Sequence, residues 1–242
     1  EICPGEGDSC ELPVYEGRQV EPDQDVASAM APFLARTEEV RNRELGVSVV
    51  ALFPKSREEE TALGNLLADL MREARDGDVA IMNGGGIRAD LLPGALTYGA
   101  FYTVFPFDNR FAVANISGEQ LYQIVGDVLE GSGSIISLSG ITAVAECGDQ
   151  GMSLTLLRTD GTPVAPEDEV RLIVSDFIAM GGDGLLEEVL AAGVEPEIES
   201  GRPIRDVLVD LMEDGSGDLD PAQYLDTQSP RISYPGSRPI CQ

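Results

Sequence analysis

The sequence predicts an α+β fold, a mixed β-sheet with packed helices. Some segments carry apolar residues at helical spacing, whereas others are short apolar runs bounded by Gly, Pro, Asn or Asp. The two kinds of segment interleave irregularly, and turn signals such as Asp160-Gly161 indicate hairpins between some strands. At 242 residues the chain is long enough to bury a substantial core, in one large domain or two small ones.

The first third of the chain predicts a linker, two helices and two strands. Residues 1–20 are rich in Pro, Gly and acidic residues without periodicity, which is typical of a linker. A helix is expected over 25–43, although Pro32 should kink it or delay its start. The elements expected next are a strand over 47–53, a helix over 61–75 and a strand over 79–82.

The rest of the chain predicts short strands and helices. Ser117 should cap a helix that ends near Leu129, because Glu119 and Gln120 occupy its first turn. The other expected elements are helical turns over 98–104, strands over 111–116, 141–146, 153–157 and 170–175, and helices over 185–192 and 204–212.

Acidic residues dominate the charge of the chain. There are 43 Asp and Glu against 16 Lys and Arg, and Lys55 is the only lysine. Such a surface repels nucleic-acid backbones and anionic membranes, so neither is an expected partner. No apolar run reaches the roughly 18 residues of a membrane span. No signal-peptide pattern is present and the first residue is Glu1, so we interpret the chain as a mature or trimmed fragment.

The four cysteines are Cys3, Cys10, Cys147 and Cys241. None forms a CxxC motif and the chain has no histidine, so a zinc site is poorly supported. Disulfides are favoured, which indicates an oxidising compartment. Of the three pairings that four cysteines allow, we expect Cys3–Cys10 as a local loop in the linker and Cys147–Cys241 as a staple for the C-terminal tail. The alternative is four reduced cysteines in a cytosolic protein.

Two glycine-rich stretches carry the strongest functional signal. The first reads NGGGIR, from Asn83 to Arg88, and the second reads DFIAMGGDG, from Asp176 to Gly184. Glycines let a ligand approach the main chain, allow positive φ, and let successive N–H groups form an anion nest. Arg88 adds a fork of donors that fits a phosphate or carboxylate. With the aromatic and carboxylate residues of the second stretch, this predicts a pocket for a nucleotide.

These motifs resemble the C-terminal domain of the 5′-nucleotidase, UDP-sugar hydrolase and 2′,3′-cyclic phosphodiesterase family. The resemblance rests on GNLLAD from Gly64, on the stretch from Asn83 through PFDN at 106–109, and on SDF with GGDG within 175–184. It runs over roughly 20–209 and implies that 21–242 form one such domain, with that family's fold. The role it implies is substrate recognition in nucleotide catabolism.

The resemblance implies roles for an aromatic pair, an aspartate and two glycines. Phe107 and Phe177 would stack on the two faces of the nucleobase. Asp183 would accept hydrogen bonds from ribose hydroxyls, and Gly85 and Gly182 would let the ligand come close to the backbone. The alternatives are two core phenylalanines and a turn aspartate that bonds its own backbone.

It also implies roles for two arginines and an asparagine. Arg57 lies seven residues before Gly64, as an anion-contacting arginine of the family does, and Arg88 matches a second one. Asn83 matches an asparagine that contacts the base edge in some members. The alternatives are an intrachain ion pair for Arg57 and a plain strand-end turn residue for Asn83.

In the family, hydrolysis takes place in an N-terminal metallophosphoesterase domain that binds two divalent metal ions. We therefore expect no catalytic residue, metal or cofactor in this chain, and no hydrolysis by it alone. The acidic loop over 214–220 lacks EF-hand spacing and is interpreted as a solvated loop rather than a calcium site. The expected partners are a nucleotide or nucleoside and the N-terminal domain, in the periplasm, outside the cell or at its surface.

Three alternative functions remain at this point. The chain could be a free-standing nucleoside-binding module, or a structural or dimerising domain that has lost the pocket. It could also serve a related hydrolase that acts on UDP-sugars or cyclic nucleotides, because stacking on an aromatic pair tolerates different bases.

Overall fold

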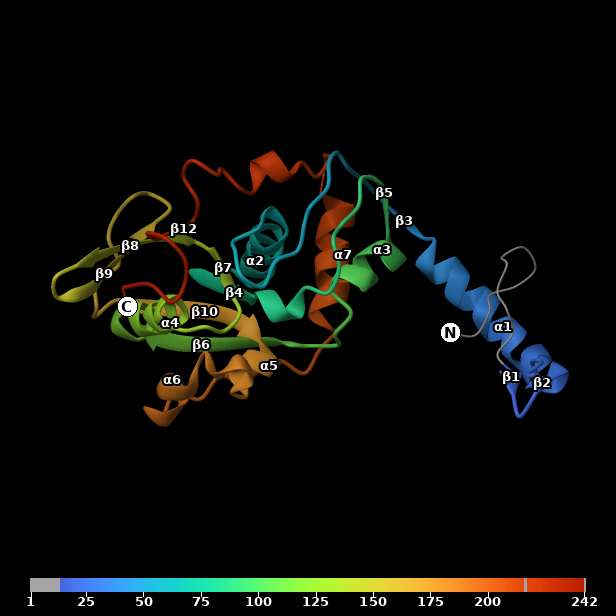
Figure 1. The fold of residues 1–242 in the computed structure, drawn as a ribbon. Helices are drawn as coiled ribbons and strands as arrows, with labels where there is room; N and C mark the ends of the chain where they lie inside the picture. The colour runs from blue at the N-terminus through green and yellow to red at the C-terminus, as the bar shows by residue number, and fades with distance from the viewer. Residues whose placement is uncertain (1–13, 216, 242) are drawn as a thin grey trace. The chain divides into compact units, whose positions relative to one another are not determined.

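The computed structural model describes residues 14–215 and 217–241, and the chain divides into two compact units, 1–42 and 43–242 (Figure 1). The expected Cys3–Cys10 loop lies outside the described residues. The expected domain boundary after residue 20 stays a prediction. Among the described residues, no helix combines the length and the hydrophobicity that crossing a membrane requires.

The first unit contains a short hairpin and one helix. Strands β1 (Val14–Tyr15) and β2 (Arg18–Gln19) pair antiparallel, and helix α1 spans Gln24–Arg41. Asp23 caps α1 by accepting from two backbone N–H groups of its first turn. The late start expected because of Pro32 is wrong, since the helix runs through that residue. Every residue of α1 is exposed, so water can satisfy the carbonyl that Pro32 leaves without a donor.

The second unit is built on a five-stranded mixed sheet with the order β11-β6-β10-β4-β7. The strands are β4 (Val79–Asn83), β6 (Phe111–Ser117), β7 (Ile136–Ser139), β10 (Glu169–Ser175) and β11 (Glu197–Ile198). β4 and β10 pair parallel, whereas the other neighbours pair antiparallel. The α+β fold with a mixed sheet is therefore confirmed.

Each face of this sheet is covered by helices, and the alternation along β4 shows why. Ala80 and Met82 point into one apolar cluster, which contains α2 (Ala62–Arg75) and α7 (Ile204–Asp214). The neighbouring residues Val79 and Ile81 point into a second cluster, which contains α4 (Gly118–Glu130). A strand that is buried on both faces reads as a continuous apolar run, as β4 does. Figure 1 shows α2 and α7 lying side by side over the sheet.

The helix caps follow the sequence signals closely. The Thr61 hydroxyl accepts from Gly64 N at 3.0 Å and begins α2. Ser117 caps α4, as the sequence predicts, and it forms a reciprocal capping box with Gln120. Helix α3 spans Tyr98–Val104, the range expected for it.

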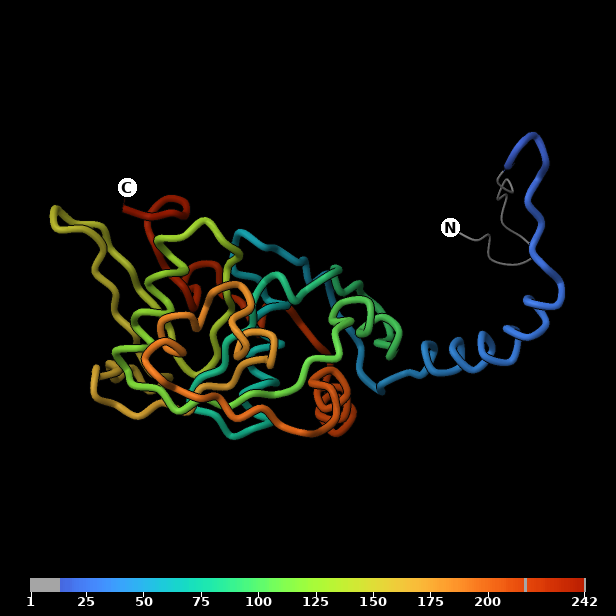
Figure 2. Tube along the Cα trace, turned by 90° about the horizontal axis from the view of Figure 1, so that it is seen from below, coloured from blue at the N-terminus to red at the C-terminus, as the bar shows by residue number. Residues whose placement is uncertain are grey.

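Two smaller sheets complete the unit. Strands β8 (Ile141–Gly148) and β9 (Gly151–Arg158) form a hairpin that projects from one end, and β12 (Ile232–Ser233) pairs parallel with β8 (Figures 1 and 2). The expected disulfide between Cys147 and Cys241 is present and joins the C-terminal tail to this hairpin.

The other small sheet pairs β3 (Glu44–Val49) with β5 (Gly94–Thr97), a strand that the sequence reading missed. The strand expected over 47–53 begins earlier, at Glu44, and ends earlier, at Val49. It ends there because Val50 N bonds to Leu219 O and Phe53 makes only an isolated bridge with Leu91. The remaining elements are α5 (Asp176–Ala179), α6 (Glu187–Ala191) and the 3₁₀ turns η1 (Gly84–Gly86), η2 (Gly182–Gly184) and η3 (Pro221–Gln223).

Candidate functional site

A pocket of about 160 Å³ opens where the two parallel strands of the sheet end. Asn83 is the last residue of β4 and Ser175 is the last residue of β10. Phe111 begins the antiparallel strand β6 opposite Ser175, so the segment before β6 reaches the same edge. In open α/β sheets, ligands bind outside the carboxyl ends of the strands, and this pocket has that position.

Six of the eight predicted site residues line this pocket: Arg57, Asn83, Gly85, Phe107, Phe177 and Asp183. The sequence reading missed five other lining residues: Met82, Gly86, Phe105, Asn109 and Ser175. All five lie within or beside the quoted motifs. Their position next to the glycine and aromatic residues was therefore the sequence signal that could have identified them as lining residues.

The two phenylalanines are not core residues. The exposed fraction is 43% for Phe107 and 44% for Phe177, which excludes the alternative of two core phenylalanines. Both rings lie in the pocket lining with much of their surface open to solvent. We call residues 106–109 the Phe107 wall and residues 175–184 the Phe177 wall.

Gly85 allows three polar side chains to meet. A Cβ at this position would lie 3.0 Å from Arg57 Nη2, 3.4 Å from Asn83 Nδ2 and 3.6 Å from Asp183 Oδ2. The approach of a ligand to this backbone, which the triple glycine predicts, stays a prediction. Gly84–Gly86 form a 3₁₀ turn, and none of these three described residues uses the positive φ that glycine allows.

Asn83 and Asp183 form the polar centre of the pocket. Asn83 is buried, and its Nδ2 donates to Asp183 Oδ2 at 2.7 Å. Asp183 adopts φ 55° in η2, a left-handed conformation that Asp tolerates better than most residues. A carboxylate has several lone pairs, so Asp183 keeps accepting capacity beyond the bond to Asn83.

The two predicted arginines differ in position. Arg57 lines the pocket. Its backbone O accepts from Ile135 N, and Ile135 O in turn accepts from Gly84 N. Two backbone hydrogen bonds therefore connect Arg57 to the glycine turn. Arg88 lies at the rim rather than in the lining, where its Nη1 donates to Gly85 O at 3.2 Å and its guanidinium carbon lies 5.9 Å from the Phe107 ring centre. Neither arginine forms an ion pair with a residue that the structure describes.

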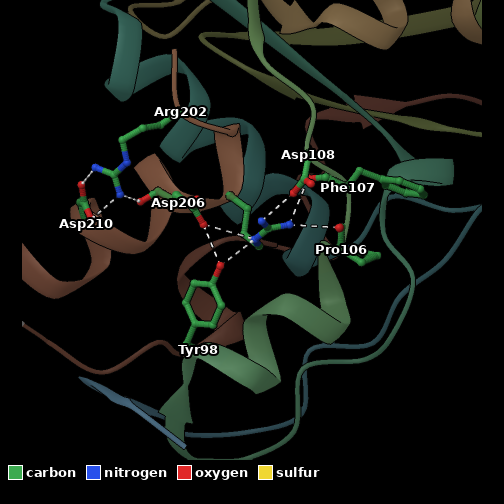
Figure 3. Close-up of polar contacts among 8 residues, drawn as sticks. Tyr98, Pro106, Phe107, Asp108, Arg202, Asp206 and Asp210 are labelled. Atoms are coloured by element: carbon green, nitrogen blue, oxygen red, sulfur yellow. Dashed lines mark hydrogen bonds and ion pairs between the residues drawn. The ribbon is translucent and has the colours of Figure 1, made fainter. Parts of the chain in front are cut away.

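A buried arginine holds the Phe107 wall, whose residues Pro106, Phe107 and Asp108 are labelled in Figure 3. Arg205 on α7 is only 4% exposed, and its Nη1 donates to Pro106 O at 3.0 Å and to Phe107 O at 3.3 Å. Its Nη2 donates to Asp108 Oδ1 at 2.8 Å. Burial opposes the charge of Arg205, but hydrogen bonds to Asp108 and Tyr98 outweigh burial and raise its pKa. The sequence reading missed Arg205, which is 98 residues away from Phe107.

Local contacts hold the Phe177 wall. Ser175 caps α5 by accepting from Ile178 N. The Phe177 ring lies against Gly182, where an added Cβ would come within 2.5 Å of Cε1 and of the Phe177 carbonyl oxygen. Gly182 is thus outside the pocket lining but lies against the ring. Asn109 Nδ2 donates to Asp176 Oδ1 at 2.8 Å, so one hydrogen bond joins the two walls.

Within 14–215 and 217–241, no group of three or more His, Cys, Asp or Glu residues is placed to hold a metal ion. The pocket therefore offers two exposed aromatic rings, an amide-bound carboxylate and one arginine in its lining, with a second arginine at its rim. This arrangement can bind a flat ring and hydroxyl groups and can attract an anion, but the described side chains supply no dimetal centre that would activate water.

Comparisons with known proteins identify the family of this chain. The family described as "5′-nucleotidase, C-terminal domain" matches residues 44–192. The endonuclease YhcR of Bacillus subtilis is 30% identical over 190 residues, which are 78% of this chain and 16% of that protein. The trifunctional nucleotide phosphoesterase protein YfkN of the same species is 33% identical over 190 residues, with 72% of this chain and 13% of that protein covered.

A solved structure shows the same fold. The 5′-nucleotidase precursor from Thermus thermophilus superposes with a TM-score of 0.70 and 21% identity, over 86% of this chain and 43% of that one. The chain thus spans less than half of that structure and about a sixth or less of the two Bacillus proteins. Since the family match covers more than half of the residues, this chain belongs to the family of 5′-nucleotidase C-terminal domains.

Proposed function

We propose that this chain is the substrate-binding part of a 5′-nucleotidase-type phosphoesterase. The observation that carries the proposal is the pair of exposed rings, Phe107 and Phe177, in one pocket with the Asn83–Asp183 pair. The two rings stack on the nucleobase, and stacking contributes about 1–3 kcal/mol per base. Asp183 accepts hydrogen bonds from the ribose hydroxyls, while the amide of Asn83 orients it.

The phosphate lies toward Arg57 and Arg88. In a chain with a net charge of −27, two arginines without an ion pair among the described residues are cations available for an anionic ligand. The pocket volume of about 160 Å³ is below the roughly 300–1,000 Å³ of a complete small-molecule site. This chain therefore holds part of the substrate, and a metallophosphoesterase domain with two divalent metal ions completes the site and hydrolyses the ester.

The compartment follows from the disulfide. Cys147 and Cys241 are bonded, and disulfides persist in oxidising compartments, so we place the protein in the periplasm, outside the cell or at its surface. The resident substrate is a nucleotide such as AMP. Stacking on the two rings discriminates poorly between AMP, a UDP-sugar and a cyclic nucleotide. Titration of the same pocket with each of the three ligands distinguishes them.

Calorimetric titration of the 242-residue chain with adenosine and AMP tests this proposal. We expect saturable binding with a Kd near 1 mM, about −4 kcal/mol. Replacing Phe107 and Phe177 by Ala should weaken it at least about tenfold. Phe33→Ala, which removes an exposed phenylalanine of the first unit, is the matched control and should bind like the wild type.

Two outcomes would contradict the proposal. Equal affinity of the double variant and the wild type would show that the rings do not bind the base. Release of phosphate from AMP by the purified chain with a divalent metal would show that it is more than a binding part. If the wild-type chain bound adenosine or AMP only when joined to a catalytic domain, the proposal would hold only for the site that the two domains form together.

A further inference from the structure

Arg205 is a buried cation whose donors are directed at three consecutive residues. Its side chain is 5% exposed, and it donates to the carbonyls of Pro106 and Phe107 and to the carboxylate of Asp108. The Asp108 side chain, by contrast, is 77% exposed. An exposed carboxylate gains little from a partner by itself, so the main effect of this arrangement is to fix the backbone on both sides of Phe107.

The opposite side of Arg205 is fixed as well. Its Nε donates to the Tyr98 hydroxyl at 3.2 Å and lies 3.4 Å from Asp206 Oδ1, while Tyr98 donates to the same carboxylate oxygen at 2.9 Å. Its guanidinium carbon lies 4.5 Å from the centre of the Tyr102 ring. Arg205 therefore connects the Phe107 wall to α3 and α7, two helices packed in the core.

Phe107 needs such support because its ring is 43% exposed. A half-exposed ring has few neighbours that restrict its rotamer, so its position depends on where the backbone holds it. A ring that is held in place before the ligand arrives loses less conformational freedom on binding, which strengthens the complex.

We propose that Arg205 is a positioning residue, which fixes the backbone of the Phe107 wall so that the Phe107 ring is pre-organised for an aromatic ligand. This inference rests on the proposed function of the pocket. Arg205 is not among the residues that line the pocket, so it acts through residues 106–108. Lysine cannot replace it, because a single ammonium group lacks the planar fork that reaches two carbonyls and a carboxylate at once.

The test is a double-mutant cycle measured with two ligands. Arg205→Lys should weaken adenosine binding about tenfold, because an ammonium group cannot reach all three acceptors at once. Asp108→Asn should weaken it about threefold, because a neutral acceptor makes a weaker bond to the guanidinium. Neither variant should change the affinity for ribose 5-phosphate, which has no aromatic ring. In a Phe107→Ala background both variants should have no further effect. Arg202→Lys, in an exposed pair with Asp210, is the matched control.

A second measurement does not depend on the ligand. In the ligand-free chain, Arg205→Lys should lower the backbone order parameters of 106–108 from about 0.85 toward about 0.6. Residues 176–178 of the Phe177 wall should keep their values. If the wild type binds no adenosine, the proposed function fails, and these order parameters alone decide whether Arg205 positions the wall.

Two results would overturn the inference. One is that Arg205→Lys weakens the binding of ribose 5-phosphate as much as that of adenosine, or that it weakens adenosine binding just as much in the Phe107→Ala background. The other is an unchanged set of order parameters at 106–108. Either result would mean that Arg205 only stabilises the fold in general. If Arg205→Lys fails to fold, Asp108→Asn can still be measured, because the Asp108 side chain is exposed and its replacement should leave the fold intact.

Discussion

Phe107 and Phe177 line one pocket with nearly equal exposure, 43% and 44%, but different parts of the chain hold them. The Phe107 wall depends on Arg205, a buried cation 98 residues further along the chain. The Phe177 wall depends on Ser175 and Gly182, which lie within five residues of the ring. The Phe107 wall is thus held by a buried side chain of a distant helix, whereas the Phe177 ring rests on nearby backbone. The rest of the Phe177 wall is also bound from a distance, through Asn83 to Asp183 and through Asn109 to Asp176.

This difference has a consequence for how each wall fails. A charge network in a low-dielectric interior is costly to leave incomplete, so a change in the Phe107 wall should reduce stability together with binding. A glycine turn at the surface has fewer partners, so a change in the Phe177 wall should reduce stability less than a change in the Phe107 wall. Variants of each wall can test this contrast.

The largest effect is expected from Arg205→Met. It removes the donor of two backbone carbonyls, and two acceptors left without a partner cost about 3 kcal/mol of unfolding free energy in sum, whereas water can solvate the exposed Asp108. Urea denaturation followed by circular dichroism measures this loss. The control Arg202→Met breaks an exposed ion pair and should change stability by less than about 1 kcal/mol. If both variants lost the same unfolding free energy, Arg205 would contribute no more to stability than an exposed arginine.

Gly182→Ala should produce the next largest effect. Its Cβ would come within 2.5 Å of the Phe177 carbonyl oxygen and ring, so the ring must leave its position. We expect a stability loss of about 2 kcal/mol, as for other overpacked sites, and at least about tenfold weaker adenosine binding. Thermal melting and titration of the same sample measure both quantities.

Gly181→Ala is the control for this variant. Gly181 has φ 94°, and an added Cβ would meet no atom within 4 Å. Alanine there should cost about 1 kcal/mol of backbone strain and leave the Phe177 ring in place. If Gly181→Ala weakened adenosine binding as much as Gly182→Ala, the turn conformation rather than the ring contact would govern the Phe177 wall.

The same contrast explains how far the sequence could predict the site. The glycines, the phenylalanines and Asp183 lie in short motifs, so their approach to one pocket could be expected from the sequence alone. Arg205 lies in an ordinary amphipathic helix, and nothing in its local pattern indicates a buried charge. Its role depends on where α7 packs against α3, which is a tertiary property.

The fold shows a similar limit. Capped or strongly apolar elements such as α2, α4 and β4 could be predicted, because cap residues and periodicity are local signals. Strands β5 and β7 have four residues each and were missed, because they depend on pairing with β3 and β4. Strand β3 was expected to run to Phe53, but its pairing ends at Val49. Strand limits depend on partners, which local patterns do not specify.

The hydrogen bond between the two walls provides a third test. Asn109 Nδ2 donates to Asp176 Oδ1 at 2.8 Å, and bonds to charged groups contribute about 1.5 kcal/mol. Asn109→Ala should therefore destabilise the chain by about that amount and weaken adenosine binding. A double-mutant cycle with Asp176→Ala measures the coupling between the walls. Strict additivity would mean that the two walls are held independently.

The smallest effect concerns pH and distinguishes the walls without altering the pocket. Burial raises the pKa of Tyr98 above its ordinary value of 10.0, and a hydrogen bond to Asp206 adds to this while one to Arg205 opposes it. A raised folded-state pKa favours the neutral phenol in the folded chain. Its contribution to stability is fully present below pH 10 and is lost as the pH rises through the folded-state pKa.

Tyr98→Phe should thus lower the unfolding free energy by about 1 kcal/mol at pH 7.5, because two hydrogen bonds are lost. The difference in unfolding free energy between the wild type and this variant should become smaller above pH 10, because only the wild type has a phenol that can ionise there. Urea midpoints at pH 7.5, 10 and 11 measure the gap, and Tyr102→Phe, which keeps its ring against Arg205, is the control. The order parameters of 106–108 should fall in alkali while those of 176–178 hold, since Tyr98 supports only the Phe107 wall. Equal loosening of both walls would show that alkali acts on the whole unit, and the two phenylalanines would then share one source of support.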